Sequence, residues 1–78
     1  MSEYQVFLQE RNRIDFLIEK GFKITNVVEN LNGSYVEFEK NGEDDEKEVL
    51  HIATPEGRKY FTVILIQQQK LEMSNGGG

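Results

Sequence analysis

The stretch Ser34-Tyr35-Val36-Glu37-Phe38-Glu39-Lys40 decides the fold, because its side chains alternate as they do in a half-buried strand. Its odd-numbered residues fall on one face, and Val36 and Phe38 fall on the other. Asn32-Gly33 precedes the stretch and Asn41-Gly42 follows it. Asn-Gly is typical of type I′ hairpin turns, in which both central residues need positive φ. We therefore predict that residues 34–40 form the middle strand of an antiparallel meander.

The segment before this strand, residues 2–20, has the signals of a complete helix. Ser2 and Gln5 fit a capping box, in which the serine hydroxyl accepts a hydrogen bond from the amide of Gln5. Gly21 is the residue expected just past a helix C-terminus. The apolar side chains recur at helical spacing and predict a core-facing stripe of Tyr4, Phe7, Leu8, Ile14, Leu17 and Ile18.

Three residues of this helix depart from the pattern of the stripe. Arg11 and Asp15 fall inside it, four residues apart, where opposite charges can pair. Phe16 falls on the opposite face. One interpretation makes Phe16 an isolated exposed ring, and the other makes it a contact for a partner.

Residues 22–31 and 48–53 are predicted to be the strands on either side of the central one. The first is rich in β-branched residues. Its Val27-Val28 step breaks the alternation and indicates a bulge or a strand covered on both faces. In the later strand, one face carries Leu50 and Ile52, and the other carries Val49 and His51.

The C-terminal segment can be interpreted in two ways. Thr54-Pro55-Glu56 is a typical helix start, with threonine as N-cap, proline at the first position and an acid in the first turn. As a strand, the segment would instead offer a buried, β-branched run at residues 61–66. As a helix, it has one stripe of Tyr60, Phe61, Ile64, Leu65 and Leu71, with Gln68 among them.

We predict an α+β fold in the order α-β-β-β-α, with both helices on one face of the sheet. The alternative is α-β-β-β-β, with a fourth strand at residues 59–70. Residues 1–73 are expected to form one small domain, and residues 74–78 a flexible glycine-rich tail.

Composition limits the range of functions. The chain has 78 residues, no cysteine and a net charge of -5, from 14 acidic and 9 basic residues. This size is near the lower limit for a self-sufficient core, which a second copy often completes, so we expect a homodimer. Without cysteine there is no disulfide or thiolate metal site. We expect no signal peptide, no membrane span and a cytoplasmic location.

No group of residues typical of catalysis stands out, so we expect a protein that is not an enzyme and uses no cofactor or metal. His51 is the only histidine, and we interpret it as a residue on a sheet face, hydrogen-bonded to a carboxylate. The acidic run Glu43-Asp44-Asp45-Glu46 lacks the spacing of a calcium loop and predicts an exposed, solvated turn.

These observations favour a small acidic protein–protein interaction module: a regulator, adaptor or inhibitor of the kind that bacteria and their phages encode. Self-association through a two-fold interface is one use of such a module, and a negative surface that mimics DNA is a variant. The candidate interface combines apolar side chains outside the helix stripes with acids of the middle strand, namely Phe16, Val63, Ile66, Glu37 and Glu39.

The alternative function is nucleic-acid binding through a local basic patch of Arg11, Arg13, Arg58 and Lys59. The order α-β-β-β-α is similar to that of double-stranded-RNA-binding domains, which place a basic cluster near the start of their second helix. Net negative charge opposes this function, because binding to phosphates depends on neutralising them.

Overall fold

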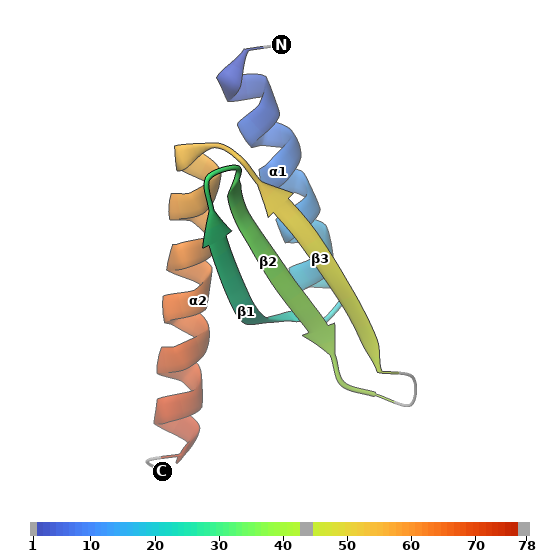
Figure 1. The fold of residues 1–78 in the computed structure, drawn as a ribbon. Helices are drawn as coiled ribbons and strands as arrows, with labels where there is room; N and C mark the ends of the chain where they lie inside the picture. Colours follow the sequence, from blue (N-terminus) through green and yellow to red (C-terminus); the bar gives the residue numbers. More distant parts are fainter. Residues whose placement is uncertain (1, 43–44, 77–78) are drawn as a thin grey trace.

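The chain folds as helix, three strands and helix (Figure 1). The computed structural model describes residues 2–42 and 45–76, with side chains as far as Leu71. This order confirms the predicted α+β meander and makes residues 59–70 helical. The elements are α1 (Glu3–Glu19), β1 (Lys23–Asn30), β2 (Gly33–Lys40), β3 (Glu46–Ile52) and α2 (Pro55–Gly76).

The three strands form one antiparallel sheet in the order β1-β2-β3, and both helices pack on one of its faces (Figure 1). In β2 the buried residues are Ser34, Val36 and Phe38, as the alternation predicts. The opposite face of the sheet carries no helix. The core lies between the helices and the sheet and consists of Ile14, Leu17, Phe22, Ile24, Val36, Phe38, Ile52 and Phe61.

Both helix ends of α1 form as the sequence predicts. The Ser2 hydroxyl accepts a hydrogen bond from the amide of Gln5 at 3.2 Å. Gly21, just after the C-cap Lys20, has φ +97°, a conformation that glycine adopts at little cost. These two residues therefore set where the first helix begins and ends.

Two side chains assigned to the helix stripes are exposed instead. Tyr4 and Leu71 are each 66% exposed. At 1.5 Å per residue, the 22 residues of α2 span about 33 Å, whereas the eight residues of β1 span about 26 Å. The outer ends of the helices project past the sheet (Figure 1), so Tyr4 and Leu71 stay exposed at these ends. Helix α2 continues to Gly76, and residues 77 and 78 of the predicted tail lie outside the described residues.

The turn predictions were wrong in type. Neither Asn-Gly step forms a type I′ turn, because positive φ among the described residues occurs only at Gly21 and Gly33. Between β1 and β2, the Asn30 side chain accepts a hydrogen bond from the amide of Asn32 at 2.8 Å. A Cβ at position 33 would lie 2.6 Å from the carbonyl oxygen of Ile52, so glycine is needed there for space as well as for φ.

The bulge of β1 also lies elsewhere than predicted. The register shifts between Ile24 and Asn26, which makes Thr25 the extra residue. Val27 pairs with Val36 and packs against the core, while Val28 is 47% exposed. The extra residue at the bulge shifts the alternation of the strand by one position. After it, Val27 faces the core and Val28 faces the open side, as in regular alternation.

A buried carboxylate fixes the junction between β3 and α2. Glu10 of α1, 7% exposed, accepts hydrogen bonds from the amide of Ala53 at 2.7 Å and from the hydroxyl of Thr54 at 2.5 Å. Thr54 in turn caps α2 by accepting from the amide of Gly57 at 3.0 Å. A Cβ at Gly57 would lie 2.4 Å from the Glu10 carboxylate and 2.7 Å from Ile52. Glycine at this helix position therefore makes room for the carboxylate.

Candidate functional site

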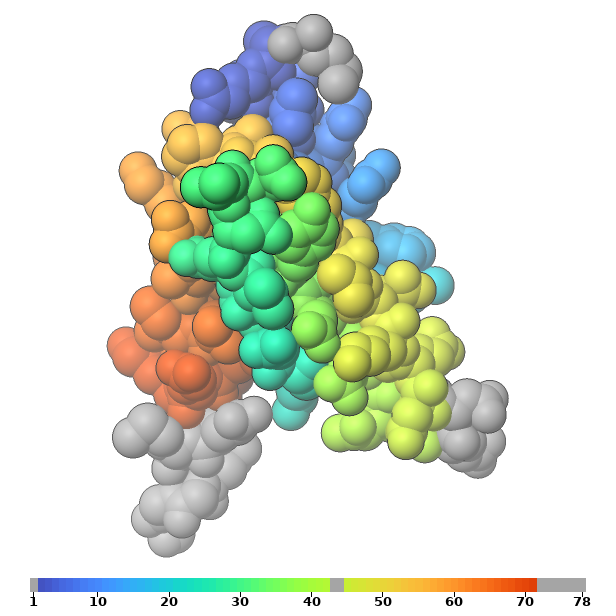
Figure 2. Space-filling model, viewed as in Figure 1, coloured from blue at the N-terminus to red at the C-terminus, as the bar shows by residue number. Residues whose placement is uncertain are grey.

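The uncovered face of the sheet displays three cross-strand rows of side chains. Strand pairing places Tyr35 between neighbours on both sides, and the same holds for Glu37 and Glu39. The face is turned toward the viewer in Figure 2. Its rows are Val28-Tyr35-His51, Asn26-Glu37-Val49 and Lys23-Glu39-Lys47.

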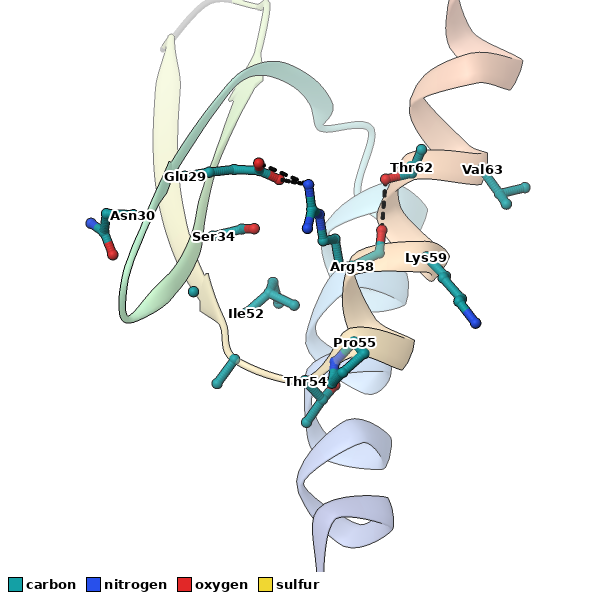
Figure 3. Close-up of a pocket in the computed structure, with 12 residues that line it drawn as sticks. Glu29, Asn30, Ser34, Ile52, Thr54, Pro55, Arg58, Lys59, Thr62 and Val63 are labelled. Carbon is teal, nitrogen blue, oxygen red and sulfur yellow. Dashed lines mark hydrogen bonds and ion pairs between the residues drawn. The ribbon is translucent and has the colours of Figure 1, made fainter.

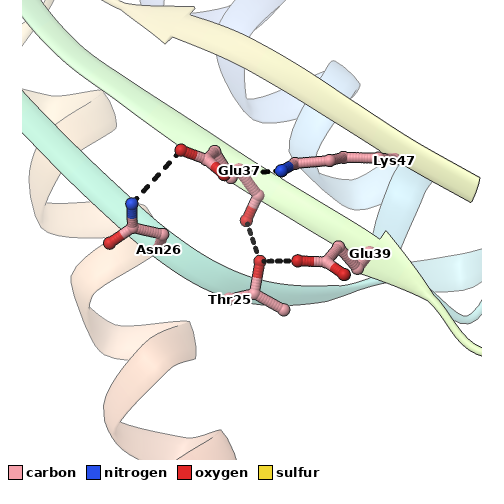
Figure 4. A network of polar contacts seen from close by, with 5 residues as sticks. All are labelled: Thr25, Asn26, Glu37, Glu39 and Lys47. Atoms are coloured by element: carbon pink, nitrogen blue, oxygen red, sulfur yellow. Dashed lines mark hydrogen bonds and ion pairs between the residues drawn. The ribbon is translucent and has the colours of Figure 1, made fainter.

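The charged rows form an internal polar network (Figure 4). The Glu37 carboxylate accepts a hydrogen bond from Asn26 and pairs with the ammonium of Lys47, both at 3.2 Å. The Asn26 hydrogen bond, followed by that from Lys47, lowers the pKa of Glu37 below its ordinary value. Thr25, the bulge residue, donates to Glu39 at 2.9 Å. The two glutamates of the central strand thus bind partners within the same face.

This arrangement gives the open face little net charge. Lys23 and Lys47 lie in one row with Glu39, so these lysines balance the charges of Glu39 and Glu37. Glu43 and Asp44 of the acidic run lie outside the described residues. A negative surface of the DNA-mimic kind therefore gains no support from the described face.

His51 stacks on Tyr35 at the other end of the face. The ring centroids lie 4.7 Å apart, with 18° between the planes. His51 Nε2 lies 2.7 Å from the carbonyl oxygen of Asn32, and it must donate because a carbonyl only accepts. His51 lies on a sheet face as predicted, but its hydrogen-bond partner is a backbone carbonyl rather than a carboxylate.

The outer edge of β1 is closed by a side chain from α2. Gln68 accepts a hydrogen bond from the amide of Ile24 at 3.0 Å and donates to its carbonyl at 3.1 Å. Its amide group thus bonds to Ile24 as a residue of a fourth strand would. Toward the other end of β1, Arg58 of α2 pairs with Glu29 at 2.8 Å. Together these contacts hold α2 along the β1 edge.

The outer edge of β3 lies beside α1. Strand β3 is the other terminal strand of the sheet, and an open groove of about 480 Å³ lies between it and α1. Phe16, 55% exposed, borders this groove, and the Lys20 ammonium lies 4.6 Å from the centre of its ring. The groove is lined by Asn12, Arg13, Phe16, Leu17, Glu48 and Leu50.

The other candidate interface residues are exposed on α2. Val63 and Ile66 are 53% and 47% exposed. Val63 lines a second groove, of about 800 Å³, where Arg58 reaches across to Glu29 (Figure 3). The structure therefore separates Val63 from Phe16: Phe16 borders the groove beside β3, and Val63 borders the groove beside β1.

The predicted basic patch is also divided. Arg13 lines the groove beside β3, whereas Arg58 lies at β1 and its guanidinium is paired with Glu29. Asp15, the expected partner of Arg11, instead accepts a hydrogen bond from the hydroxyl of Tyr60. This hydrogen bond, and then burial, raises the pKa of Tyr60 above its ordinary value.

The structural roles of two polar residues, Gln68 and Glu10, were not predicted from the sequence. Gln68 had a visible signal, because it is a polar residue inside an apolar helix stripe. Glu10 had none, since its partners Ala53 and Thr54 lie more than forty positions along the chain and one is a backbone amide. Among the described residues, no group of three or more histidine, cysteine or acidic side chains is arranged to hold a metal ion.

No family model, curated protein or solved structure matches this chain. Within the part of the chain that the structure describes, neither helix is long and apolar enough to cross a membrane.

Proposed function

We propose that this protein is a non-catalytic protein–protein interaction module that associates with itself through the outer edge of β3 and the groove beside it. The supporting observation is an uncovered strand edge next to an exposed aromatic ring, Phe16. An uncovered edge offers unpaired N–H and C=O groups to another strand. Apolar side chains beside such an edge add the burial that makes pairing specific.

The groove has the composition of an interface core with a polar rim. Leu17 is buried at its base and Leu50 is half-buried. Phe16 stands exposed at its border, and Arg13 and Glu48 supply opposite charges. A partner that covers Phe16 and Leu50 would remove apolar surface from water at roughly 25 cal/mol per Å². A second copy of the chain provides the same apolar groups, as a two-fold interface requires.

Self-association through β3 leaves the other candidate residues free for a further protein. Glu37 and Glu39 belong to the open face, and Val63 and Ile66 to the exposed side of α2. In this proposal the β3 contact forms the dimer, and these four residues are contacts for an outside partner.

Light scattering across a concentration series tests the proposal. Wild type is expected to approach the mass of two chains as concentration rises. Phe16→Ser is expected to shift this transition to higher concentration, because it removes the exposed ring from the groove. Val63→Ser is the matched control, since Val63 is similarly exposed but lies on the other side of the molecule. Its transition is expected to coincide with that of wild type.

A wild-type protein that keeps the mass of one chain at every concentration would overturn the proposal. Equal effects of the two variants would instead place the self-contact on α2 as well. Because both residues are more than half exposed, both variants are expected to keep the fold, and circular dichroism confirms this for each sample.

A further inference from the structure

We infer that a second copy of this chain pairs antiparallel with β3 about a two-fold axis at Val49, so that the two sheets become one continuous sheet. This inference rests on the proposed self-association and adds to it the register of the pairing and the residues that meet. It follows from three observations: the direction of the backbone groups along β3, the order of charges on that strand, and the composition of the groove.

The direction of the backbone groups follows from Gln68. In an antiparallel ladder, a residue directs its N–H and C=O to the same side. Both groups of Ile24 bond to Gln68, outside the sheet, so Ile24 does not bond to its opposite residue Phe38. Phe38 therefore directs its own groups to β3, where it lies opposite Glu48.

The same alternation fixes the rest of β3. Glu48 and every second residue from it bond to β2 through their N–H and C=O groups. The residues between them direct their N–H and C=O groups away from β2, toward the outer edge of the sheet. The outward residues are Lys47, Val49 and His51. The amide of Ala53, next in this series, indeed points out of the sheet, because it donates to Glu10 of α1. Two independent side-chain contacts, one at each edge, thus give the same assignment.

Charge then selects one register. An axis at Val49 places Val49 opposite Val49 and Lys47 opposite His51, so every outward residue of one copy meets an outward residue of the other. It also sets Glu48 opposite Leu50. No like charges are opposed in this register, and all three outward residues of each strand can exchange hydrogen bonds.

The neighbouring registers are worse. An axis at Glu48 brings two glutamates into direct opposition, and an axis at Lys47 brings together two lysines; like charges directly opposite destabilise a strand pair. An axis at Leu50 sets Lys47 opposite Ala53, whose N–H is already bonded to Glu10. Charged residues on β3 therefore oppose random pairing while permitting the register at Val49.

The groove completes the contact on the helix side of the sheet. In this register Glu48 of one copy lies opposite Leu50 of the other, at the groove that Arg13 and Phe16 also border. Each copy thus brings a carboxylate to a groove that holds an arginine. The two α1 helices flank the axis, so each Phe16 faces the partner rather than solvent.

Single cysteines test the register, because the chain has none of its own. The variants are Lys47→Cys, Val49→Cys and His51→Cys, oxidised mildly at a concentration where wild type is dimeric. At the axis the two Cα atoms would lie about 5.5 Å apart, within disulfide range. Two cysteines at position 47 would lie roughly 13 Å apart along the strand. We expect a disulfide dimer at Val49 and none above background at the other two positions.

Leu31→Cys gives the background, since Leu31 is fully exposed at the turn between β1 and β2 and reports random collisions. A maximum of cross-linking at position 47 or 51 would overturn the Val49 register while leaving self-association intact. Equal cross-linking at Leu31 and Val49 would overturn pairing through β3. Loss of the wild-type dimer itself would overturn the proposed function.

A pair of proline variants tests the backbone assignment without relying on cysteine chemistry. Val49→Pro removes an N–H that points outward, so the monomer is expected to keep its fold. It should raise the dimer dissociation constant about 100-fold, because bonds on both sides of the axis are lost. Leu50→Pro removes an N–H that bonds to β2 and is expected to unfold the sheet. The inference fails if Val49→Pro dimerises like wild type or if Leu50→Pro leaves the sheet as stable as Val49→Pro does.

Discussion

The two edges of the sheet differ in how their backbone groups are covered. At β1, Gln68 bonds both polar groups of Ile24 and Arg58 pairs with Glu29, with α2 lying along the strand (Figure 1). At β3, a groove lies between the strand and α1 instead, with Glu48 and Leu50 on the strand side. Helix α2 thus covers the edge of β1, whereas α1 leaves a groove beside the edge of β3.

This difference shows that an edge can be closed by a single side chain of the right shape. A glutamine amide presents an acceptor oxygen and N–H donors side by side, so one side chain can bond both the N–H and the C=O of Ile24. On α2 it sits within the apolar stripe, where an unpartnered amide would be costly. Its position in the stripe is therefore explained by its contact with the edge of β1.

The largest expected effect concerns the junction that aims α2 at β1. Gly57→Ala would set a methyl group 2.4 Å from the Glu10 carboxylate and 2.7 Å from Ile52. We expect a loss of about 3 kcal/mol in the free energy of unfolding, measured by urea denaturation, despite the better helix propensity of alanine.

Gly42→Ala is the control, because a Cβ there has no neighbour within 4 Å. We expect it to change stability by less than about 0.5 kcal/mol. Equal stabilities of the two variants would show that α2 shifts freely at its start, and the contrast between the edges would then not depend on this junction.

A smaller effect is expected for the closed edge itself. Gln68→Ala leaves the amide and carbonyl of Ile24 without their partner, at a cost of about 2 kcal/mol. Hydrogen exchange at the Ile24 amide should quicken by a corresponding factor. Gln67→Ala, one position away and exposed, should alter neither quantity. If both glutamine variants behave alike, Gln68 does not close the edge.

The contact between the two helices comes next in size. Tyr60→Phe removes the hydrogen bond to Asp15, and we expect a loss of about 1 kcal/mol at neutral pH. Because folding raises the pKa of Tyr60, this contribution is complete below the ordinary value of 10.0 and is lost as pH rises through the folded-state pKa. Wild type should therefore lose more stability than Tyr60→Phe in alkaline denaturation series. Parallel curves for the two proteins would refute this assignment.

The smallest effect compares the edges directly, because Glu37 has one partner on each outer strand. The Asn26 hydrogen bond is the largest single cause of its lowered pKa, and Lys47 of β3 lowers the pKa through both a hydrogen bond and its charge. Asn26→Ala and Lys47→Met should therefore each raise the pKa of Glu37 toward 4.5, as followed by carboxyl NMR. The stabilisation is present above that value and is lost as pH falls through the lowered pKa. An unchanged pKa in either variant would show that the corresponding strand does not act on Glu37.

Much of the fold was readable because it rests on local signals. The alternation of β2, the Ser2 cap, Gly21 and the Thr54-Pro55 start each act within a few residues, and each formed as predicted. The helix at residues 59–70 also followed from such signals. Turn geometry and the bulge were wrong, because they depend on contacts across strands, such as that of Gly33 with Ile52.

The candidate site was less predictable for the same reason. Phe16 was recognised as a ring outside the core stripe, and it is exposed. Its separation from Val63 depends on which edge each helix flanks, and no local pattern encodes that. Glu10 and Gln68 bond to backbone atoms 43 and 44 residues away. Because every residue type carries these backbone atoms, the sequence gives no sign of which residue is the partner.

The Gln68 contact also has a consequence for the size of an assembly. A sheet that is open at both edges can add copies without end, as in fibrils. Here α2 and Gln68 occupy the β1 side, so the pairing of two copies through β3 uses the edge that each has to offer. In the proposed pairing, growth ends at two chains, because α2 and Gln68 cover the other edge of each sheet.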